Sequence, residues 1–147
     1  MTLHSLRGHL LYAAPMRLGL GVAWLFAGRA AGVSSASALA AFGGGLFMMV
    51  FLMFNDPRLA FLRRGDPEPL PADGVVFASP VRQAVSALFP STAGLSALAA
   101  IALIPQPVLS VLLGGISAGL GVSGLLNVPR ADPELWYDRR TGRLYRR

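Results

Sequence analysis

Residues 83–129 read QAVSALFPSTAGLSALAAIALIPQPVLSVLLGGISAGLGVSGLLNVP and carry no charged side chain over 47 positions. A Pro-Gln-Pro step at residues 105–107 interrupts the stretch near its middle and predicts a tight turn. A hydrocarbon core about 30 Å thick needs about 20 apolar residues per helix. The stretch therefore predicts two membrane spans, over residues 83–104 and 108–128, joined as a helical hairpin.

A second uncharged stretch, Ala30 to Asn55, predicts a span over residues 37–54. Another span is expected over residues 18–33, although Arg29 lies near its end. The composition agrees, because 54% of the residues are hydrophobic and 14% are charged, against about 25% charged in a soluble domain. We therefore expect an all-α integral membrane protein with four transmembrane helices in two hairpins.

The expected layout is a single transmembrane domain, residues 1–147, in five parts. These are an interfacial N-terminal arm (1–15), a first hairpin (16–55), a cytoplasmic loop (56–82), a second hairpin (83–129) and a cytoplasmic tail (130–147). The arm places Leu3, Leu6 and Leu10 at helical spacing, which predicts a short amphipathic helix that ends near Pro15.

Two of the polar segments have a recognisable local pattern. The loop 56–82 is rich in proline and mixed charge, which indicates an ordered connector or a docking surface. Residues 135–145 of the tail predict a short β-hairpin, in which Asp138 opens the turn and Gly142 supplies a positive φ.

The distribution of arginine predicts the orientation. All thirteen basic residues are arginine, and twelve fall before the first span, between the second and third spans, or after the fourth. Only Arg29 falls on the opposite side. The positive-inside rule then places both termini and the 56–82 loop in the cytoplasm. A signal peptide over residues 1–33 is an alternative that would leave three spans, but this charge layout favours an intact chain.

The net charge of +6 favours anionic lipid head groups as partners over nucleic acid. The lysine-free composition is typical of a GC-rich genome, and we expect a bacterial inner membrane. The candidate contacts with lipid head groups or with a partner are cytoplasmic arginines: Arg58, Arg63, Arg64, Arg130, Arg139 and Arg140.

A candidate tandem repeat relates the two hairpins. Pro15-Met-Arg17 and Pro80-Val-Arg82 precede them, and Asn55-Asp-Pro-Arg58 and Asn127-Val-Pro-Arg130 follow them. Two spans per repeat would make the halves parallel rather than inverted. Convergent boundary chemistry is the alternative, because proline and arginine gather at membrane edges.

Small residues form a stripe on the last predicted span. Ser110, Gly114, Ser117, Gly121 and Gly124 share one narrow face at 100° per residue, and Gly115 and Gly119 form a Gly-x-x-x-Gly pair beside it. Small residues let helices approach closely in lipid, so both sets predict helix–helix packing. The pattern does not separate packing within the chain from packing in a homo-oligomer or against a membrane-protein partner.

Three residues are candidates for lining a solute path: Arg29, Gly44 and Pro90. Arg29 is an ionisable group at membrane depth, but it lies close enough to the outer end to reach the head groups. Gly44, within Gly43–Gly45, is expected to allow close packing, with Trp24 as a candidate neighbour. Pro90 is expected to bend the third span and free a carbonyl that a nearby hydroxyl can satisfy.

The chain offers little for catalysis. It has no cysteine, and all seven acidic residues lie in the predicted cytoplasmic segments. His4 and His9 both lie in the N-terminal arm, so neither a metal site nor a cofactor is predicted. The leading hypothesis is a non-catalytic scaffold or accessory subunit. The alternatives are a small channel or facilitator not coupled to protons, and, less favoured, a lipid-modifying enzyme using a cytoplasmic Arg/Asp/Glu rim.

Overall fold

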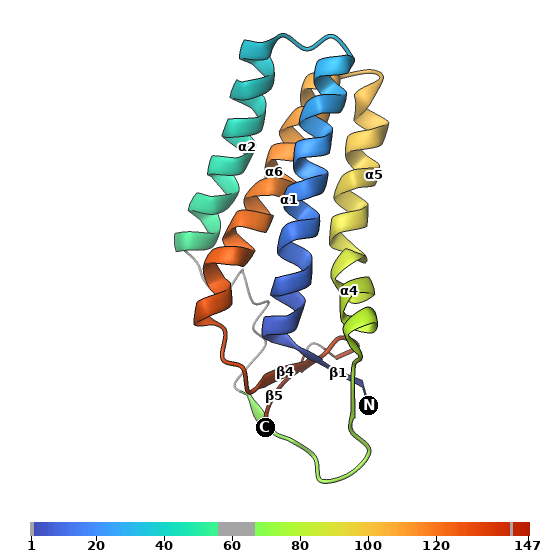
Figure 1. Cartoon of the computed structure of the whole chain (residues 1–147), viewed down its shortest axis with the longest axis vertical. Helices are drawn as coiled ribbons and strands as arrows, with labels where there is room; N and C mark the ends of the chain where they lie inside the picture. The colour runs from blue at the N-terminus through green and yellow to red at the C-terminus, as the bar shows by residue number, and fades with distance from the viewer. Residues whose placement is uncertain (1, 56–66, 142) are drawn as a thin grey trace.

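The computed structural model describes residues 2–55, 67–141 and 143–147, which form a helical bundle with a small sheet at one end (Figure 1). The helices are α1 (Leu6–Ala30), α2 (Ser35–Asn55), α4 (Pro80–Leu88), α5 (Ser91–Leu103) and α6 (Pro107–Asn127), followed by the short 3-10 turn η1 (Val128–Arg130). The strands are β1 (Thr2–Ser5), β2 (Glu68–Pro69), β3 (Val76–Phe77), β4 (Leu135–Asp138) and β5 (Leu144–Arg146).

Within the described residues, four helical segments are long and apolar enough to cross a membrane. They are Leu6–Ala30, Ser35–Met53, Pro80–Leu103 and Pro107–Arg130. The uncharged stretches of the sequence predict three of these segments, and the span expected over residues 18–33, which holds Arg29, corresponds to the first of the four. The third consists of α4 and α5 in succession, and the first begins well before its predicted start at residue 18.

Helix α1 passes through Pro15 without ending. It begins after Ser5, whose hydroxyl oxygen accepts a hydrogen bond of 3.1 Å from the backbone N–H of Gly8. Gly121 of α6 lies against the α1 backbone on both sides of Pro15: a Cβ at position 121 would sit 2.7 Å from the oxygen of Ala14 and 2.9 Å from the nitrogen of Leu18. This close packing outweighs the lost hydrogen bond, and the separate helix predicted for residues 1–15 is wrong.

Helix α6 is the centre of the bundle. Half of its most apolar window is buried inside the protein, against 11–22% for the other three segments. Helices α1, α2 and α5 all pack against α6, and Figure 1 shows them arranged around it, whereas α1 and α2 contact each other much less. The first predicted hairpin is therefore held together mainly through a helix that belongs to the second.

The sheet is larger than predicted. Its strand order is β2-β5-β4-β1-β3, and β4 and β5 form the antiparallel hairpin expected in the tail. Strand β1 pairs antiparallel with β4 and parallel with β3. An all-α fold with one hairpin was thus incomplete, since the N-terminus and the connector also supply strands. Leu3 of β1 is fully buried and Leu144 of β5 nearly so, and the register places them on opposite faces of the sheet, so both faces are covered at these points.

The sheet brings three distant segments to one end of the bundle (Figure 1): the N-terminus, the connector around residues 68–77 and the C-terminal tail. They belong to the three polar segments, before the first span, between the second and third, and after the fourth, that the charge pattern assigns to a common side. The other end carries the short link between α1 and α2 and the turn between α5 and α6.

The proposed tandem repeat stays a prediction. Pro80 occupies the first turn of α4, after Ser79, whose hydroxyl oxygen accepts from the N–H of Arg82 at 3.3 Å. Pro15 lies instead inside α1. The first Asn-Asp-Pro-Arg sequence continues into residues 56–66, which lie outside the described residues, as do the candidate head-group contacts Arg58, Arg63 and Arg64.

The glycines of α6 and α2 provide a matched test of the packing. A Cβ at Gly115 would lie 2.9 Å from the Cα of Phe42 in α2, while a Cβ at Gly44 meets nothing within 4 Å. Gly115→Ala should lower the free energy of unfolding by about 1–3 kcal/mol, because backbone has to move. Gly44→Ala is the same chemical change and should raise it by up to about 1 kcal/mol through helix propensity. Detergent-solubilised protein unfolded with SDS and followed by circular dichroism measures both; equal effects would contradict the arrangement.

Candidate functional site

The seven predicted packing residues are all buried on α6, and six of them contact α1 or α2. Towards α1, a Cβ at Gly114 would lie 2.8 Å from the Cβ of Trp24, one at Gly124 would lie 3.2 Å from the Cβ of Ala14, and the Ser117 hydroxyl donates to the Arg17 carbonyl at 3.0 Å. Towards α2, a Cβ at Gly119 would lie 2.7 Å from the oxygen of Leu46.

These contacts are all made within one chain. Gly121 also faces α1 and Gly115 also faces α2, as described above. The Ser110 hydroxyl is fully buried and forms no hydrogen bond in the structure. The two small-residue faces of α6 are thus already occupied by α1 and α2.

The glycine triplet in α2 packs differently from the expectation. Only Gly45 approaches a neighbour: a Cβ there would lie 2.6 Å from the oxygen of Leu112 and 2.9 Å from the nitrogen of Ile116. Gly43 and Gly44 face open space. Trp24 was the wrong neighbour, because its side chain covers Gly114 on α6 instead.

The three candidate path residues lie apart. Arg29 is exposed in the last turn of α1, at the end away from the sheet, and donates to the carbonyl of Val33. Gly44 faces outward on α2. Pro90 lies between α4 and α5, where the tail residue Arg139 reaches the neighbouring carbonyl of Phe89. The structure does not bring these residues together around a common path.

The helix break at Pro90 has the polar partners that the sequence predicts. Helix α4 ends at Leu88 and α5 begins at Ser91. The buried Thr92 hydroxyl donates to the Ala87 carbonyl at 3.0 Å, and Nη2 of Arg139 donates to the Phe89 carbonyl at 2.8 Å. The expectation that a hydroxyl pairs with a carbonyl freed by Pro90 is confirmed.

Arg17 of α1 joins the same break. Its Nε donates to the Thr92 oxygen at 3.1 Å, and its Nη2 donates to the Ser91 oxygen at 2.9 Å. A guanidinium among apolar helices is costly unless its donors are used, and here two hydroxyls use them. The break therefore anchors α1 to α5 through polar contacts.

A cluster of polar side chains lies where the bundle meets the sheet, formed by His4, His9, Ser86 and Tyr137. The Ser86 hydroxyl donates to the Gln83 carbonyl at 2.8 Å and lies 3.3 Å from Nδ1 of His4. The Tyr137 hydroxyl lies 3.1 Å from Nδ1 of His9. The Tyr137 ring stands near both imidazoles, with centroid distances of 5.6 and 5.7 Å.

The surroundings of the cluster favour the neutral forms of His4 and Tyr137. Burial lowers the pKa of His4, and the charges of Arg139 and Arg82 lower it further, while Asp138 opposes them. Burial also raises the pKa of the Tyr137 phenol. Because the Ser86 proton is directed to a carbonyl, Nδ1 of His4 is best assigned as the N–H that donates to Ser86.

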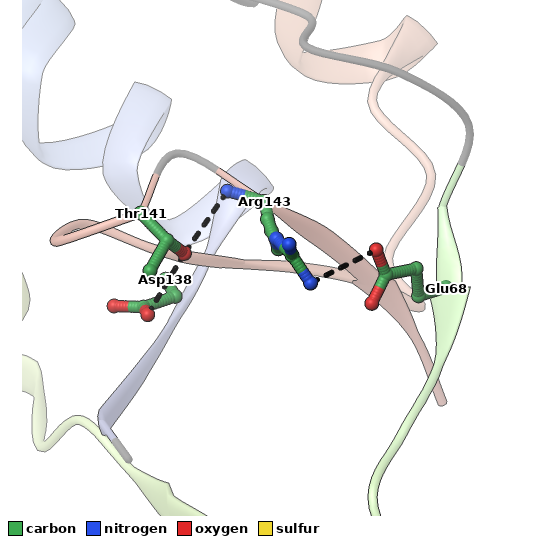
Figure 2. A network of polar contacts seen from close by, with 4 residues as sticks. All are labelled: Glu68, Asp138, Thr141 and Arg143. Carbon is green, nitrogen blue, oxygen red and sulfur yellow. Dashed lines mark hydrogen bonds and ion pairs between the residues drawn. The ribbon is translucent and has the colours of Figure 1, made fainter.

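Asp138 shapes the turn that follows β4. One of its carboxylate oxygens accepts a hydrogen bond of 2.9 Å from the Arg140 backbone N–H. Figure 2 shows the carboxylate beside Thr141, whose hydroxyl donates to the other oxygen at 2.9 Å. The predicted role of Asp138 in opening the hairpin turn is confirmed, while Gly142, expected to supply a positive φ, lies outside the described residues. On the far side of the turn, Arg143 forms an ion pair of 3.4 Å with Glu68 in β2.

A pocket of about 730 Å³ opens beside the cluster, lined by Thr2, His4, Asp138, Arg139 and Arg140. Arg139 and Arg140 are exposed, and both are predicted contacts with lipid head groups. Arg130, the other predicted contact among the described residues, follows α6 and is also exposed. Among the described residues, no group of three His, Cys, Asp or Glu side chains is placed to hold a metal ion.

The cluster and its pocket could not be predicted from the sequence. His4 and Ser86 are 82 positions apart and His9 and Tyr137 are 128 apart, so no local spacing connects them. The long-range pairing of β1 with β4 brings them together. No family model matches the chain, and no curated protein and no solved structure is significantly similar to it.

Thr92 and Ser91 allow a test of the helix break. Thr92→Val keeps the side-chain volume but leaves the Ala87 carbonyl and Nε of Arg17 without a partner, so the free energy of unfolding should fall by about 1–3 kcal/mol. Ser91→Ala removes an exposed hydroxyl that also binds Arg17, and it should lower the free energy of unfolding by less than about 1 kcal/mol. SDS unfolding of both variants measures the difference, and a larger loss for Ser91→Ala would refute this assignment.

Proposed function

We propose that this chain is a non-catalytic, multi-pass membrane protein that acts as a scaffold or accessory subunit. The observation that carries the proposal is the sheet, which gathers three distant segments into one folded platform at one end of the bundle. We place the protein in a bacterial inner membrane with both termini and the platform in the cytoplasm.

The outer surface of the bundle supports the membrane setting. Phe47 and Phe51 of α2 are 69% and 57% exposed, and Ile101 of α5 is 72% exposed. Soluble monomers rarely expose contiguous apolar surfaces of this kind, whereas lipid chains cover them at no cost. The distribution of arginine supports the orientation, since twelve of the thirteen fall on the predicted cytoplasmic side and only Arg29 lies near the link between α1 and α2.

The use of polar groups supports a structural role. Ser86 gives its proton to a backbone carbonyl rather than to His4, and both Asp138 oxygens accept hydrogen bonds within the turn. An activated nucleophile needs a base positioned to take its proton, and this cluster directs its donors into the fold instead. We infer that the cluster fastens the platform to the bundle.

The packing of α6 limits where a partner binds. Since α1 and α2 cover its glycine faces, a second copy or another membrane protein would contact the outer faces of the bundle or the platform. The platform is the more specific of these surfaces, because it combines charged turns with exposed strand edges such as Val76, which is 58% exposed.

The orientation can be tested because the natural chain has no cysteine. Ala31→Cys places a thiol in the link between α1 and α2, and Arg147→Cys places one on the platform; both positions are exposed. In intact spheroplasts, a membrane-impermeant maleimide should label Ala31→Cys alone, and lysis should make Arg147→Cys reactive as well. Labelling of Arg147→Cys before lysis would reject the proposed orientation.

The scaffold role is tested by gentle solubilisation of the tagged full chain, followed by light scattering and mass spectrometry of the purified particle. We expect a homo-oligomer or a stoichiometric membrane-protein partner. A bare monomer that conducts solute in liposomes would favour the channel alternative. Lipid turnover by the purified protein would favour an enzyme, and either result would overturn the scaffold proposal.

A further inference from the structure

We propose that the pocket lined by Thr2, His4, Asp138, Arg139 and Arg140 binds the phosphate of an anionic phospholipid head group. The proposal rests on the membrane location proposed above and adds a defined lipid site to it. It goes beyond a diffuse attraction of arginines to a charged surface, because it assigns the affinity to one pocket.

The pocket carries a net positive charge, because its lining holds two arginines and one carboxylate, that of Asp138. Arg143 and Arg146 are paired with Glu68 and Asp132, at 3.4 and 3.1 Å. In the part of the chain that the structure describes, Arg139 and Arg140 form no ion pair. A guanidinium fork suits two oxygens of a phosphate, so two adjacent arginines without a carboxylate partner make an anion the matching ligand.

Asp138, the acidic residue in the lining of the pocket, holds the turn that follows β4. Both carboxylate oxygens of Asp138 accept hydrogen bonds from the turn, one from the Arg140 N–H and one from Thr141. Asp138 therefore fixes the turn on which both arginines stand and acts as a positioning residue. The other lining residues are Thr2 and His4, and the hydroxyl of Thr2 is a suitable further donor to phosphate.

The surroundings of the pocket favour a lipid over a free phosphate. Arg139 is fastened to the bundle by its 2.8 Å bond to the Phe89 carbonyl, at the end of α4. Val81 and Val85 of α4 and Phe89, the residue directly after it, are spaced four residues apart and are 73%, 56% and 58% exposed. Cations beside an exposed apolar row match an amphiphile, with its phosphate in the pocket and its chains along α4.

The test measures binding of phosphatidylglycerol and of phosphatidylcholine to the full chain in a neutral detergent, by native mass spectrometry. We expect the wild type to prefer phosphatidylglycerol. The double variant Arg139→Gln/Arg140→Gln should bind it about 30-fold more weakly. Arg140→Gln alone should lower the affinity for phosphatidylglycerol about 5-fold. Because this variant keeps the Arg139–Phe89 hydrogen bond, it tests the pocket even if the double variant folds poorly.

The matched control is Arg143→Gln/Arg146→Gln, which removes the same two charges from the same tail but outside the pocket. It should keep nearly the wild-type affinity. If both double variants lose the same affinity for phosphatidylglycerol, the attraction is diffuse and electrostatic, and the proposal that the pocket binds the lipid is overturned. If inorganic phosphate or glycerol 3-phosphate competes as effectively as the lipid does, the pocket is a site for a free anion, and the proposal of a phospholipid ligand is overturned.

The proposed function and the lipid site can fail separately. A wild-type protein that inserts with the expected cysteine labelling but shows no preference for phosphatidylglycerol would overturn the lipid site alone. A protein that does not enter the membrane would overturn the proposed function, and the lipid site with it.

Discussion

Close approach between helix backbones is the constraint on which the rest of the structure depends. At Gly114, Gly115, Gly119 and Gly121, a single added carbon would lie within 3 Å of the backbone or Cβ atoms of α1 or α2. In lipid there is little hydrophobic drive between helices, so shape and dispersion have to hold them together. Glycine permits this on two faces of α6 at once, and α6 becomes the helix around which the others are placed.

The side chains with charged or aromatic polar groups make their contacts around this centre, whereas within it the Ser117 hydroxyl donates to the Arg17 carbonyl. Arg17 meets Ser91 and Thr92 at the break in the third span, and the rings of His4, His9 and Tyr137 lie at the boundary with the sheet. These contacts join segments that are far apart in the chain. The glycine faces set the distances between helices, while the polar contacts set how the helices are anchored to the sheet.

The sequence predicts the spans well because charge is so unevenly distributed. An arginine or aspartate inside a span is expensive, and a stretch as long as residues 83–129 without one is typical of a chain that crosses a bilayer. The sequence also predicts the tail hairpin, since Asp138 has a local role in the turn. It misjudges Pro15, because the packing that keeps α1 continuous comes from Gly121, more than a hundred residues later. The candidate pocket was out of reach for the same reason, as β1 and β4 lie at opposite ends of the chain.

The central position of α6 also constrains the order in which the molecule can be built. Ribosomes deliver α1 and α2 before α6, the helix that both pack against, and the strand β4 that pairs with β1 follows later still. Until then the N-terminal half has no stable partner of its own. Most of the packing surface of α1 and α2 therefore forms only once α6 has been synthesised, so folding of the bundle cannot be completed in the order in which its helices leave the ribosome.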